Sequence, residues 1–583
     1  MDAHPALSLP FPAARQADWE PLARAALKGR PSSTLVHRLL DGMDVQPLYT
    51  AESPAAGASS VGARVGAWDI RAEHSADDPA AIADDVAREA SSIWLRDPAR
   101  TGWTAARLAP LLAVIPEGVG VIVECPSQGG PALAALRSLK RPLIGGLQVD
   151  PLGELAVRGG LDGTLDGAWD DIAALHEDGL PDHFFVTSIS TLPVAEAGGS
   201  VVSELAWMLG CGAALLRALD ARGVSPADAR VGLTIGVGRD QLTGLARLRA
   251  ARRLWTHLLA ACGVPAARVP VHARQLDRGL STRDPWTNLL RGTMAGFVGA
   301  VGGADAVTLR PFDAALGTPG ALGRKLALNT QLLLAHESEL DATVDPAHGA
   351  WALESLTDDL CRAAWARFQE WEGRGGVAAM LHSGDLQSIV AQEAAERGKR
   401  IADRTDVLVG VSEFALPQAL DLDTAPAVPL AAHPAPTVQP LVPRPDAAPW
   451  EALQAAGQDS GEQVFVANWG PLRTHKARAE WVANLVHASG LTVVQGAPDQ
   501  ASDQICAAFV ASGARAVVIC AADKHQLDAV VALHAMLTFA GARWCAVAGK
   551  PVGPGLPPLT HLFQGGPALA PMTALHAALE VGQ

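Results

Sequence analysis

Short apolar runs with the period of β-strands alternate with longer segments of helical period over most of this chain. The candidate strands before residue 310 are 118–124, 143–149, 183–190, 230–237, 269–274 and 304–309. The helical patterns are 203–221, 242–262, 322–339 and 356–372. Strands that alternate with helices predict βαβ units and a parallel sheet. We therefore expect an α/β protein with a (β/α)8 TIM-type barrel at 61–416, preceded by an N-terminal arm at 1–60.

The alternation stops at a proline-rich segment and then resumes on a shorter scale. Nine prolines fall within residues 417–450, which have neither period and predict an extended linker. The strand-like runs beyond it are 463–467, 491–495, 516–520, 544–548 and 561–564. We expect residues 451–583 to form a flavodoxin-like parallel sheet. Ligands of such sheets bind beyond the carboxyl ends of the strands, so the loop at 468–478 is a candidate site.

Composition narrows the class of protein. The net charge of −15 and the pI near 5.6 disfavour nucleic-acid binding. The seven cysteines show no Cys-x-x-Cys spacing and lie in apolar segments, which predicts buried free thiols in a reducing cytoplasm. The N-terminus lacks the pattern of a signal peptide, and no apolar run reaches the roughly 18 residues of a membrane span. We expect a cytoplasmic protein that contacts neither nucleic acid nor membrane.

The segment 284–357 has the layout of an enzyme site, yet the polar residues that a site would need are sparse. Gly302-Gly303 precedes a short apolar run at 306–309. The polar residues that follow on predicted helices are Arg324, Asn329, Gln331, His336 and Glu337. His336-Glu337 has no second histidine at helical spacing, so we expect a solvated helix face rather than a metal site. This combination suggests an enzyme architecture whose chemistry has been lost.

Other isolated motifs favour structure over chemistry. Gly236-x-Gly238 lacks the third glycine of a dinucleotide fingerprint. Gly565-Gly566 is more typical of a tight turn than of a nucleotide cradle. A loose acidic cluster is typical of helix caps and solvent faces. Its members are Asp341, Asp345, Asp358 and Asp359.

Several long motifs, in order, resemble those of methylmalonyl-CoA mutases. The matching segments are Val45-Gln-Pro-Leu-Tyr-Thr50, the helix pattern Leu245-Ala-Arg-Leu-Arg-Ala-Ala-Arg-Arg-Leu-Trp255, Asn329-Thr-Gln331, Asp345-Pro-(x2)-Gly349 and Glu354-Ser-Leu-Thr357. A barrel, a proline-rich linker and a flavodoxin-like, cobalamin-binding-type domain are also the layout of that family. The resemblance covers nearly the whole chain.

The C-terminal domain departs from the family's cobalamin motif. Catalytic subunits carry Asp-x-His-x-x-Gly after the first strand, where the histidine binds cobalt and the aspartate holds its imidazole. Aligned on Gly470, this chain has Leu472 at the aspartate position and Thr474 at the histidine position. His475 is one residue away, and we interpret it as a residue near the start of a helix, in water. The resemblance thus implies a degenerate cobalamin domain.

The barrel departs at three further motifs. The family's Ser-Ile-Ser-Gly-Tyr-His becomes Ser188-Ile-Ser-Thr-Leu-Pro193, so a proline replaces the histidine that contacts the thioester. The Trp-x-x-Arg-x-Tyr motif becomes Trp68-Asp-Ile-Arg71-Ala-Glu73, and a carboxylate at the tyrosine position would cost desolvation energy beside a corrin. The cofactor motif His-Thr-Asn-x-x-Asp-Glu-Ala becomes Thr308-Leu-Arg-Pro-Phe-Asp313-Ala-Ala315.

The chain therefore resembles the small, non-catalytic subunit of heterodimeric methylmalonyl-CoA mutase. That resemblance implies a large partner subunit that binds adenosylcobalamin and interconverts succinyl-CoA and (R)-methylmalonyl-CoA. We expect no catalytic, cofactor-binding or metal-ligating residue in this chain, and a barrel interior filled by side chains. Two alternatives stay open: a self-sufficient mutase for another acyl-CoA, which would need His475 or another ligand for cobalt, and a barrel scaffold for a different partner, such as a mutase-protecting G-protein.

The N-terminal arm has apolar residues but no core of its own. They are Leu22, Ala25, Ala26, Leu39, Leu40 and Leu48. Such groups must be buried against another surface. We expect the arm between Trp19 and Tyr49 to contact the large subunit, although Leu39 and Leu40 could equally pack on this chain's own barrel.

Overall fold

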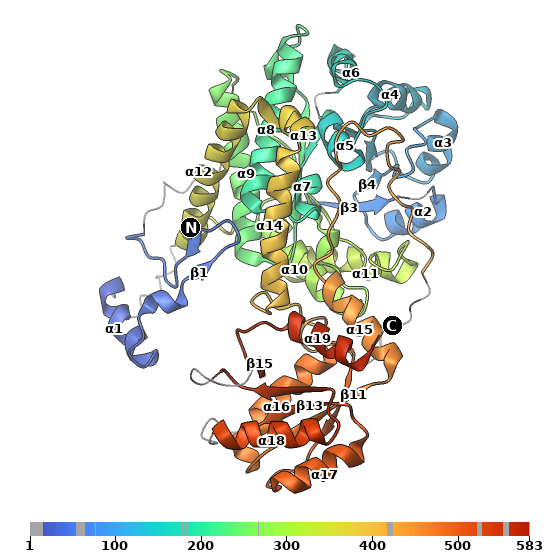
Figure 1. Ribbon diagram of the computed structural model, residues 1–583. Coiled ribbons are helices and arrows are strands. Elements are labelled where there is room, and N and C mark those ends of the chain that lie inside the picture. Colours follow the sequence, from blue (N-terminus) through green and yellow to red (C-terminus); the bar gives the residue numbers. More distant parts are fainter. Residues whose placement is uncertain are drawn as a thin grey trace.

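A computed structural model shows two bodies, a large one built around a barrel and a smaller C-terminal sheet domain (Figure 1). The structure describes residues 15–53, 64–75, 77–177, 179–181, 183–265, 267–416, 422, 424–521, 527–551 and 559–581. The expected TIM-type barrel followed by a flavodoxin-like domain is confirmed.

The barrel closes eight parallel strands in the order β10-β3-β4-β5-β6-β7-β8-β9. Their bounds are β3 Asp69–His74, β4 Ser92–Leu95, β5 Gly120–Glu124, β6 Gly145–Val149, β7 Phe185–Ser190, β8 Val231–Val237, β9 Val271–Gln275 and β10 Ala306–Thr308. The sequence did not predict β3 and β4. β3 alternates polar with apolar residues, which hides it among loops, and β4 has only four residues.

The longest helices pack together on one side of the barrel. They are α8 Val201–Asp220, α9 Gln241–Ala261 and α12 Trp351–Gly373. Ser200 caps α8 by accepting the Ser203 N–H at 3.2 Å, and Asp240 caps α9 in the same way through Thr243. By length and composition α8 could cross a membrane, although no unbroken apolar run in the sequence indicated this. In this fold, 89% of its most apolar window is buried. Its composition therefore reflects its place in the core.

The remaining helices cover the barrel and join it to the second domain (Figure 1). Those after barrel strands are α2 Pro79–Ala87, α3 Ala105–Ala113, α4 Gly129–Ser138, α5 Pro151–Arg158, α6 Leu165–Glu177, α7 Leu192–Glu196, α10 Thr287–Val301 and α11 Ala321–Leu332. Later in the chain come α13 Gly376–Ser383 and α14 Asp385–Ala402. α5 shows how the sequence sets such bounds: Asp150 caps its start, Pro151 opens it, and Gly159 ends it with a φ of +79°.

The proline-rich segment lies along the barrel rather than free in solvent. Residues 424–447 form neither helix nor strand apart from one bridge between Ala425 and Thr318. Their backbone donates to carbonyls of the barrel domain, as from Leu441 to Ala156 at 2.7 Å and from Arg444 to Glu196 at 2.8 Å. In Figure 1 this orange thread passes beside α5. Proline removes N–H donors, so the segment extends and its remaining donors bind the neighbouring surface.

The C-terminal domain is a five-stranded parallel sheet in the order β12-β11-β13-β14-β15. Its strands are β11 Gln463–Asn468, β12 Thr492–Gln495, β13 Ala516–Cys520, β14 Trp544–Ala548 and β15 Thr560–Leu562. Its helices are α15 Ala448–Ser460, α16 Leu472–His487, α17 Ser502–Ser512, α18 Leu527–Phe539 and α19 Leu569–Leu579. The buried indole of Trp450 on α15 donates to the carbonyl of Ile401 on α14, which ties this domain to the barrel.

The N-terminal arm divides into two parts. The hairpin of β1 His37–Arg38 and β2 Asp44–Val45 lies on the barrel domain, and Leu39 packs against the main hydrophobic core. Helix α1, Gln16–Ala26, has no buried residue. Leu22 on α1 is 71% exposed. The hairpin thus packs on this chain's own barrel, whereas α1 leaves Leu22 exposed and its other residues at most half-buried.

Candidate functional site: the mouth of the barrel

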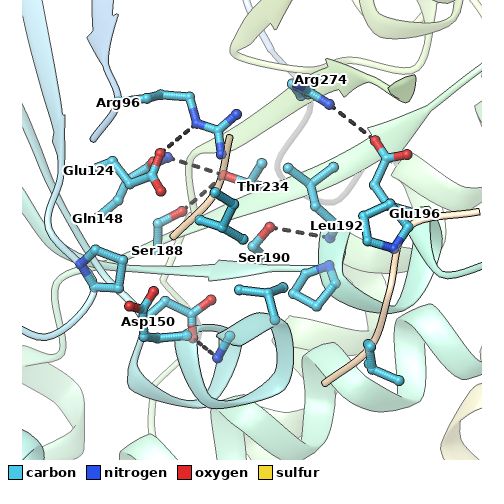
Figure 2. A pocket seen from close by; sticks show the side chains of 18 of the residues that line it. Arg96, Glu124, Gln148, Asp150, Ser188, Ser190, Leu192, Glu196, Thr234 and Arg274 are labelled. Atoms are coloured by element: carbon cyan, nitrogen blue, oxygen red, sulfur yellow. Dashed lines mark hydrogen bonds and ion pairs between the residues drawn. The ribbon is translucent and has the colours of Figure 1, made fainter. Parts of the chain in front are cut away.

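A cavity of about 310 Å³ lies where the barrel strands β4 to β9 end (Figure 2). Active sites of TIM-type barrels lie at this face. Charged side chains dominate one part of its wall: Arg96, Arg100, Glu124, Glu154, Glu196 and Arg274. The sequence reasoning named none of these six as site residues.

Buried side chains from several strands contact one another inside the barrel. The indole of Trp94 from β4 reaches across to the imidazole of His272 from β9, with an edge-on contact of 5.2 Å between ring centres. His272 in turn shares a 2.8 Å hydrogen bond with Thr308. Ser188 and Thr234 are joined at 3.0 Å on the other side. All five side chains are buried, and Trp94, Ser188 and Thr234 also line the cavity; that the rest of the barrel interior is filled stays a prediction.

Glu73 is the centre of the charged cluster. Its carboxylate lies 3.0 Å from Arg96, 3.1 Å from Arg274 and 2.8 Å from Arg310. Burial alone would raise the pKa of Glu73, but the three guanidinium groups outweigh burial and hold that pKa well below its usual range. The desolvation cost expected for this carboxylate is therefore offset by arginines of the same chain.

A second group of ion pairs continues around the mouth. Arg100 lies 3.0 Å from Glu124 and 2.7 Å from Glu154, and Glu154 also pairs with Arg158 at 2.7 Å. Arg96 pairs with Glu124 at 2.5 Å (Figure 2) and so joins this group to the cluster around Glu73. Each arginine of this group has a carboxylate partner, so the wall offers little free positive charge to the carboxyl group of a substrate.

Two carboxyl groups at the mouth bind protons more tightly than usual. Burial raises the pKa of Asp150 to about 7, although its side chain accepts the Gly153 N–H at 2.9 Å. Burial, and then the nearby Asp277, raise the pKa of Glu196, although Arg274 lies 3.1 Å away. Such groups could serve as acids or bases near neutral pH. However, Asp150 caps α5, and Glu196 accepts the Asp277 and Arg278 N–H groups, both at 2.8 Å.

The proline-rich segment covers part of this mouth. Leu430, Leu441 and Pro443 line the cavity from outside the barrel. Arg158, which is buried, donates from Nε to the carbonyl of Ala431 at 2.7 Å and so holds the segment down. Access to the cavity from this side is therefore restricted by the chain itself.

Comparison with known proteins identifies the family of this chain. The methylmalonyl-CoA mutase family profile matches residues 135–432. The small subunit of methylmalonyl-CoA mutase from Streptomyces virginiae is 34% identical over 93% of this chain and 94% of its own. The small subunit from Propionibacterium freudenreichii subsp. shermanii is 30% identical over 92% and 90%. This chain belongs to the methylmalonyl-CoA mutase family. Escherichia coli methylmalonyl-CoA mutase is also similar, at 32% identity over 42% of this chain and 35% of its own.

The motifs shared with the methylmalonyl-CoA mutase family have structural roles here. Arg249 of the long-helix motif on α9 pairs with both Asp345 and Glu354, which joins three of the matching segments. Arg252 of the same motif donates to the carbonyls of Val269 and Gly303. Gln331 accepts the Trp68 indole N–H at 3.0 Å.

The positions where the chain departs from the family lie near both candidate sites. Pro193 opens the short helix α7 and lines the mouth cavity, where it offers no donor. In the C-terminal domain, Leu472 is 54% exposed, and the hydroxyl of Thr474 donates to the carbonyl of Pro471. A leucine side chain, and a threonine hydroxyl already bound to a carbonyl of its own helical turn, are poor candidates for holding a cobalt cofactor.

His475 corrects the sequence interpretation. We expected this residue in water, but it is 1% exposed on the fourth position of α16. Burial lowers its pKa. The side chain turns inward because α16 starts at Leu472 and presents its apolar face, with Ala479 and Val482, to the sheet. Both ring nitrogens of His475 are buried and have no hydrogen-bond partner in the part of the chain that the structure describes.

The other motifs noted in the sequence lie apart from the mouth cavity. His336 and Glu337 are exposed on a helical turn, as expected. Asp358 and Asp359 both pair with the exposed Arg362 on α12. Gly565 follows β15 with a φ of +82°, which fits the expected turn. Arg96, Arg274 and Arg310 were missed because an arginine at a strand end has no sequence signal until its partner is known.

Proposed function

We propose that this chain is the small, non-catalytic subunit of a heterodimeric methylmalonyl-CoA mutase. The large partner subunit would bind adenosylcobalamin and convert succinyl-CoA and (R)-methylmalonyl-CoA into each other by a radical 1,2-rearrangement. The observation that carries this proposal is the mouth of the barrel. Arginines of the chain neutralise its carboxylates, and the proline-rich segment covers part of it.

The residues of the C-terminal domain support assigning the cofactor to the partner. The loop after β11 offers an exposed leucine and a threonine bound to its own helix turn, and the nearby imidazole of His475 is buried. Asn468, at the end of β11, uses its amide to bind Gln495 and the carbonyl of Gly496. These residues do not fit a cobalt-bound corrin, so we route no chemical step through this domain.

The exposed helix α1 supports the proposal that this chain has a stable partner subunit. Trp19, Leu22 and Leu27 lie on this helix or at its end, and none is buried within the chain. An obligate subunit interface buries more than about 2,000 Å² and is apolar at its centre. We propose that α1 packs on the large subunit. We also propose a cytoplasmic complex, since the seven cysteines are free thiols.

The experiment compares three preparations: this chain alone, the large subunit alone, and the two co-expressed. We expect the large subunit and the complex to show mutase turnover and the spectrum of protein-bound cobalamin. We expect this chain alone to show neither the turnover nor the spectrum. Turnover of methylmalonyl-CoA by this chain alone would favour the self-sufficient enzyme. A large subunit that never co-purifies with this chain would favour a scaffold for another partner.

A further inference from the structure

A second cavity, of about 440 Å³, shares no lining residue with the cavity at the mouth of the barrel. Its walls come from the arm hairpin, the start of α9, the turn after β9, and the end of α14. Six arginines line it: Arg239, Arg247, Arg278, Arg291, Arg397 and Arg400. The acidic residues in the same wall are Asp240, Asp406 and Asp446. The lining therefore carries an excess of positive charge.

The three aspartates leave part of that charge uncompensated. Arg400 binds Asp406 through two hydrogen bonds of 2.9 and 3.0 Å. Arg278 binds both oxygens of Asp446 at 3.1 Å. The third aspartate, Asp240, caps α9.

The remaining arginines have weaker partners. Arg239 lies 3.9 Å from the shared Asp446, and Arg247 lies 3.3 Å from the buried Glu204. Within the described ranges, Arg291 and Arg397 have no carboxylate within ion-pair distance.

Arg291 and Arg397 are instead held by uncharged oxygens. Arg291 donates to the Asn288 side chain at 2.6 Å and to the Val409 carbonyl at 2.7 Å. Arg397 donates to the carbonyls of Gly198 and Gly199 at 3.4 and 3.1 Å. Burial, followed by a neighbouring arginine, lowers the pKa of each to about 10. An anion that enters the cavity would therefore stabilise these two buried guanidinium groups.

Further donors are held without acceptors. The Nε atoms of Arg247 and Arg278 are buried and have no hydrogen-bond partner in the part of the chain that the structure describes. These buried N–H groups have no acceptor among the described residues, which adds to the positive charge of this wall that nothing there offsets. The start of the 21-residue helix α9 lies in the same wall and adds a partial positive charge.

We propose that this cavity binds a small phosphate-bearing molecule. Guanidinium groups from several elements suit a phosphate, whose oxygens accept several bidentate bonds at once. The cavity has room for a diphosphate or a nucleotide. The arm hairpin of the same chain closes one side, since Leu39 and Leu40 line it and Arg400 donates to the Arg38 carbonyl at 2.9 Å. A wall built by the chain itself favours a small molecule over a partner's side chain.

The test uses pyrophosphate as the probe, titrated into the full-length chain at low ionic strength in a calorimeter. We expect saturable binding at one site. Arg397→Gln and Arg239→Gln should each weaken it about tenfold or more, because each removes a positive charge that would bind the phosphate oxygens. Arg543→Gln, an exposed arginine of the C-terminal domain paired with Glu580, is the matched control and should leave binding unchanged. Circular dichroism checks that each variant is folded.

Two further titrations identify the source of the phosphate. Tighter binding of ADP than of pyrophosphate would assign a nucleotide, and the reverse would assign a free diphosphate. No saturable binding of either anion would overturn the proposal, as would an equal loss in all three variants. If neither anion binds and Arg397→Gln prevents co-purification with the large subunit, the arginines belong to a protein interface instead. Arg239→Gln keeps the test valid if Arg397→Gln does not fold, because Arg239 is exposed.

Discussion

Glu73 and Arg274 lie 3.1 Å apart at the mouth of the barrel, and both side chains are almost fully buried. Glu73 comes from the first barrel strand and Arg274 from the seventh, and in the closed barrel only β10 lies between these two strands, so the pair spans one side of the mouth. Arg274 also binds Glu196 and Asp277. A ligand carboxylate could bind Arg274 only by displacing carboxylates of the chain that this arginine already binds.

Replacing Glu73 should destabilise the fold. Glu73→Gln leaves Arg96, Arg274 and Arg310 short of one carboxylate in a buried place, so we expect a loss of about 3–5 kcal/mol in the free energy of unfolding. Chemical denaturation measures it. Glu580→Gln removes an exposed partner of Arg543 and should cost about 1 kcal/mol or less. Equal costs for the two variants would contradict the importance of the buried network.

The same variant should change the response to acid. The pKa of Glu73 is depressed in the fold, so its contribution to stability is present above its unfolded pKa, about 4.5, and is lost as the pH falls through the folded pKa. The difference in stability between the wild type and Glu73→Gln should therefore shrink at acidic pH. Denaturation curves at several pH values test this, and a difference independent of pH would contradict it.

Asp150→Asn should have the opposite pH dependence. The pKa of Asp150 is raised from 3.8 to about 7, so between those values the unfolded chain has lost a proton that the folded chain keeps. The wild type then loses up to about 1.4 kcal/mol per pH unit as the pH rises, and asparagine, which still caps α5, does not. The variant should gain stability relative to the wild type from about pH 4 to about pH 7. A constant difference would show that Asp150 titrates normally.

Gly159→Ala should release the proline-rich segment from the barrel. Gly159 has a φ of +79°, and a Cβ there would lie 2.7 Å from the Val438 carbonyl oxygen. Gly163 has a φ of +128° with nothing within 4 Å, so Gly163→Ala is a control for backbone strain alone. We expect Gly159→Ala to cost about 1–3 kcal/mol more than the control and to increase proteolysis within 424–447. Equal protection in both variants would show that the segment is not held at this point.

The arm contact is best tested by a deletion that spares the hairpin. Because Leu39 packs on this chain's own core, removing residues 1–45 would also damage the barrel. Removing residues 1–35 takes away α1, which has no buried residue. We expect co-purification with the large subunit to fall at least tenfold, with the unfolding temperature of the isolated chain unchanged. Unchanged affinity for the large subunit would remove α1 from the interface.

The sequence predicted the architecture because periodicity reports burial. Strands such as Val231–Val237 are buried on both faces, and their apolar runs are visible in one dimension. β3 was missed because it places Arg71 and Glu73 inside the barrel, where a polar residue normally argues against a strand. The charged mouth was also missed, because Glu73 and Arg274 are 201 residues apart and only the closed barrel brings them together.

His475 shows a second limit of sequence reasoning. A histidine near the start of a helix can face solvent or the sheet, and the choice depends on where the helix begins. α16 begins at Leu472, which turns His475 toward the core. A shift of one residue in that start would rotate its side chain by about 100°.

Turnover by the purified chain tests the account most directly. The chain is incubated with adenosylcobalamin and methylmalonyl-CoA, with and without the large subunit, and succinyl-CoA is measured. We predict no turnover above background for the chain alone, and turnover once the large subunit is added. Succinyl-CoA formed by the chain alone, free of any partner, would contradict the claim that its barrel has lost the chemistry of the family.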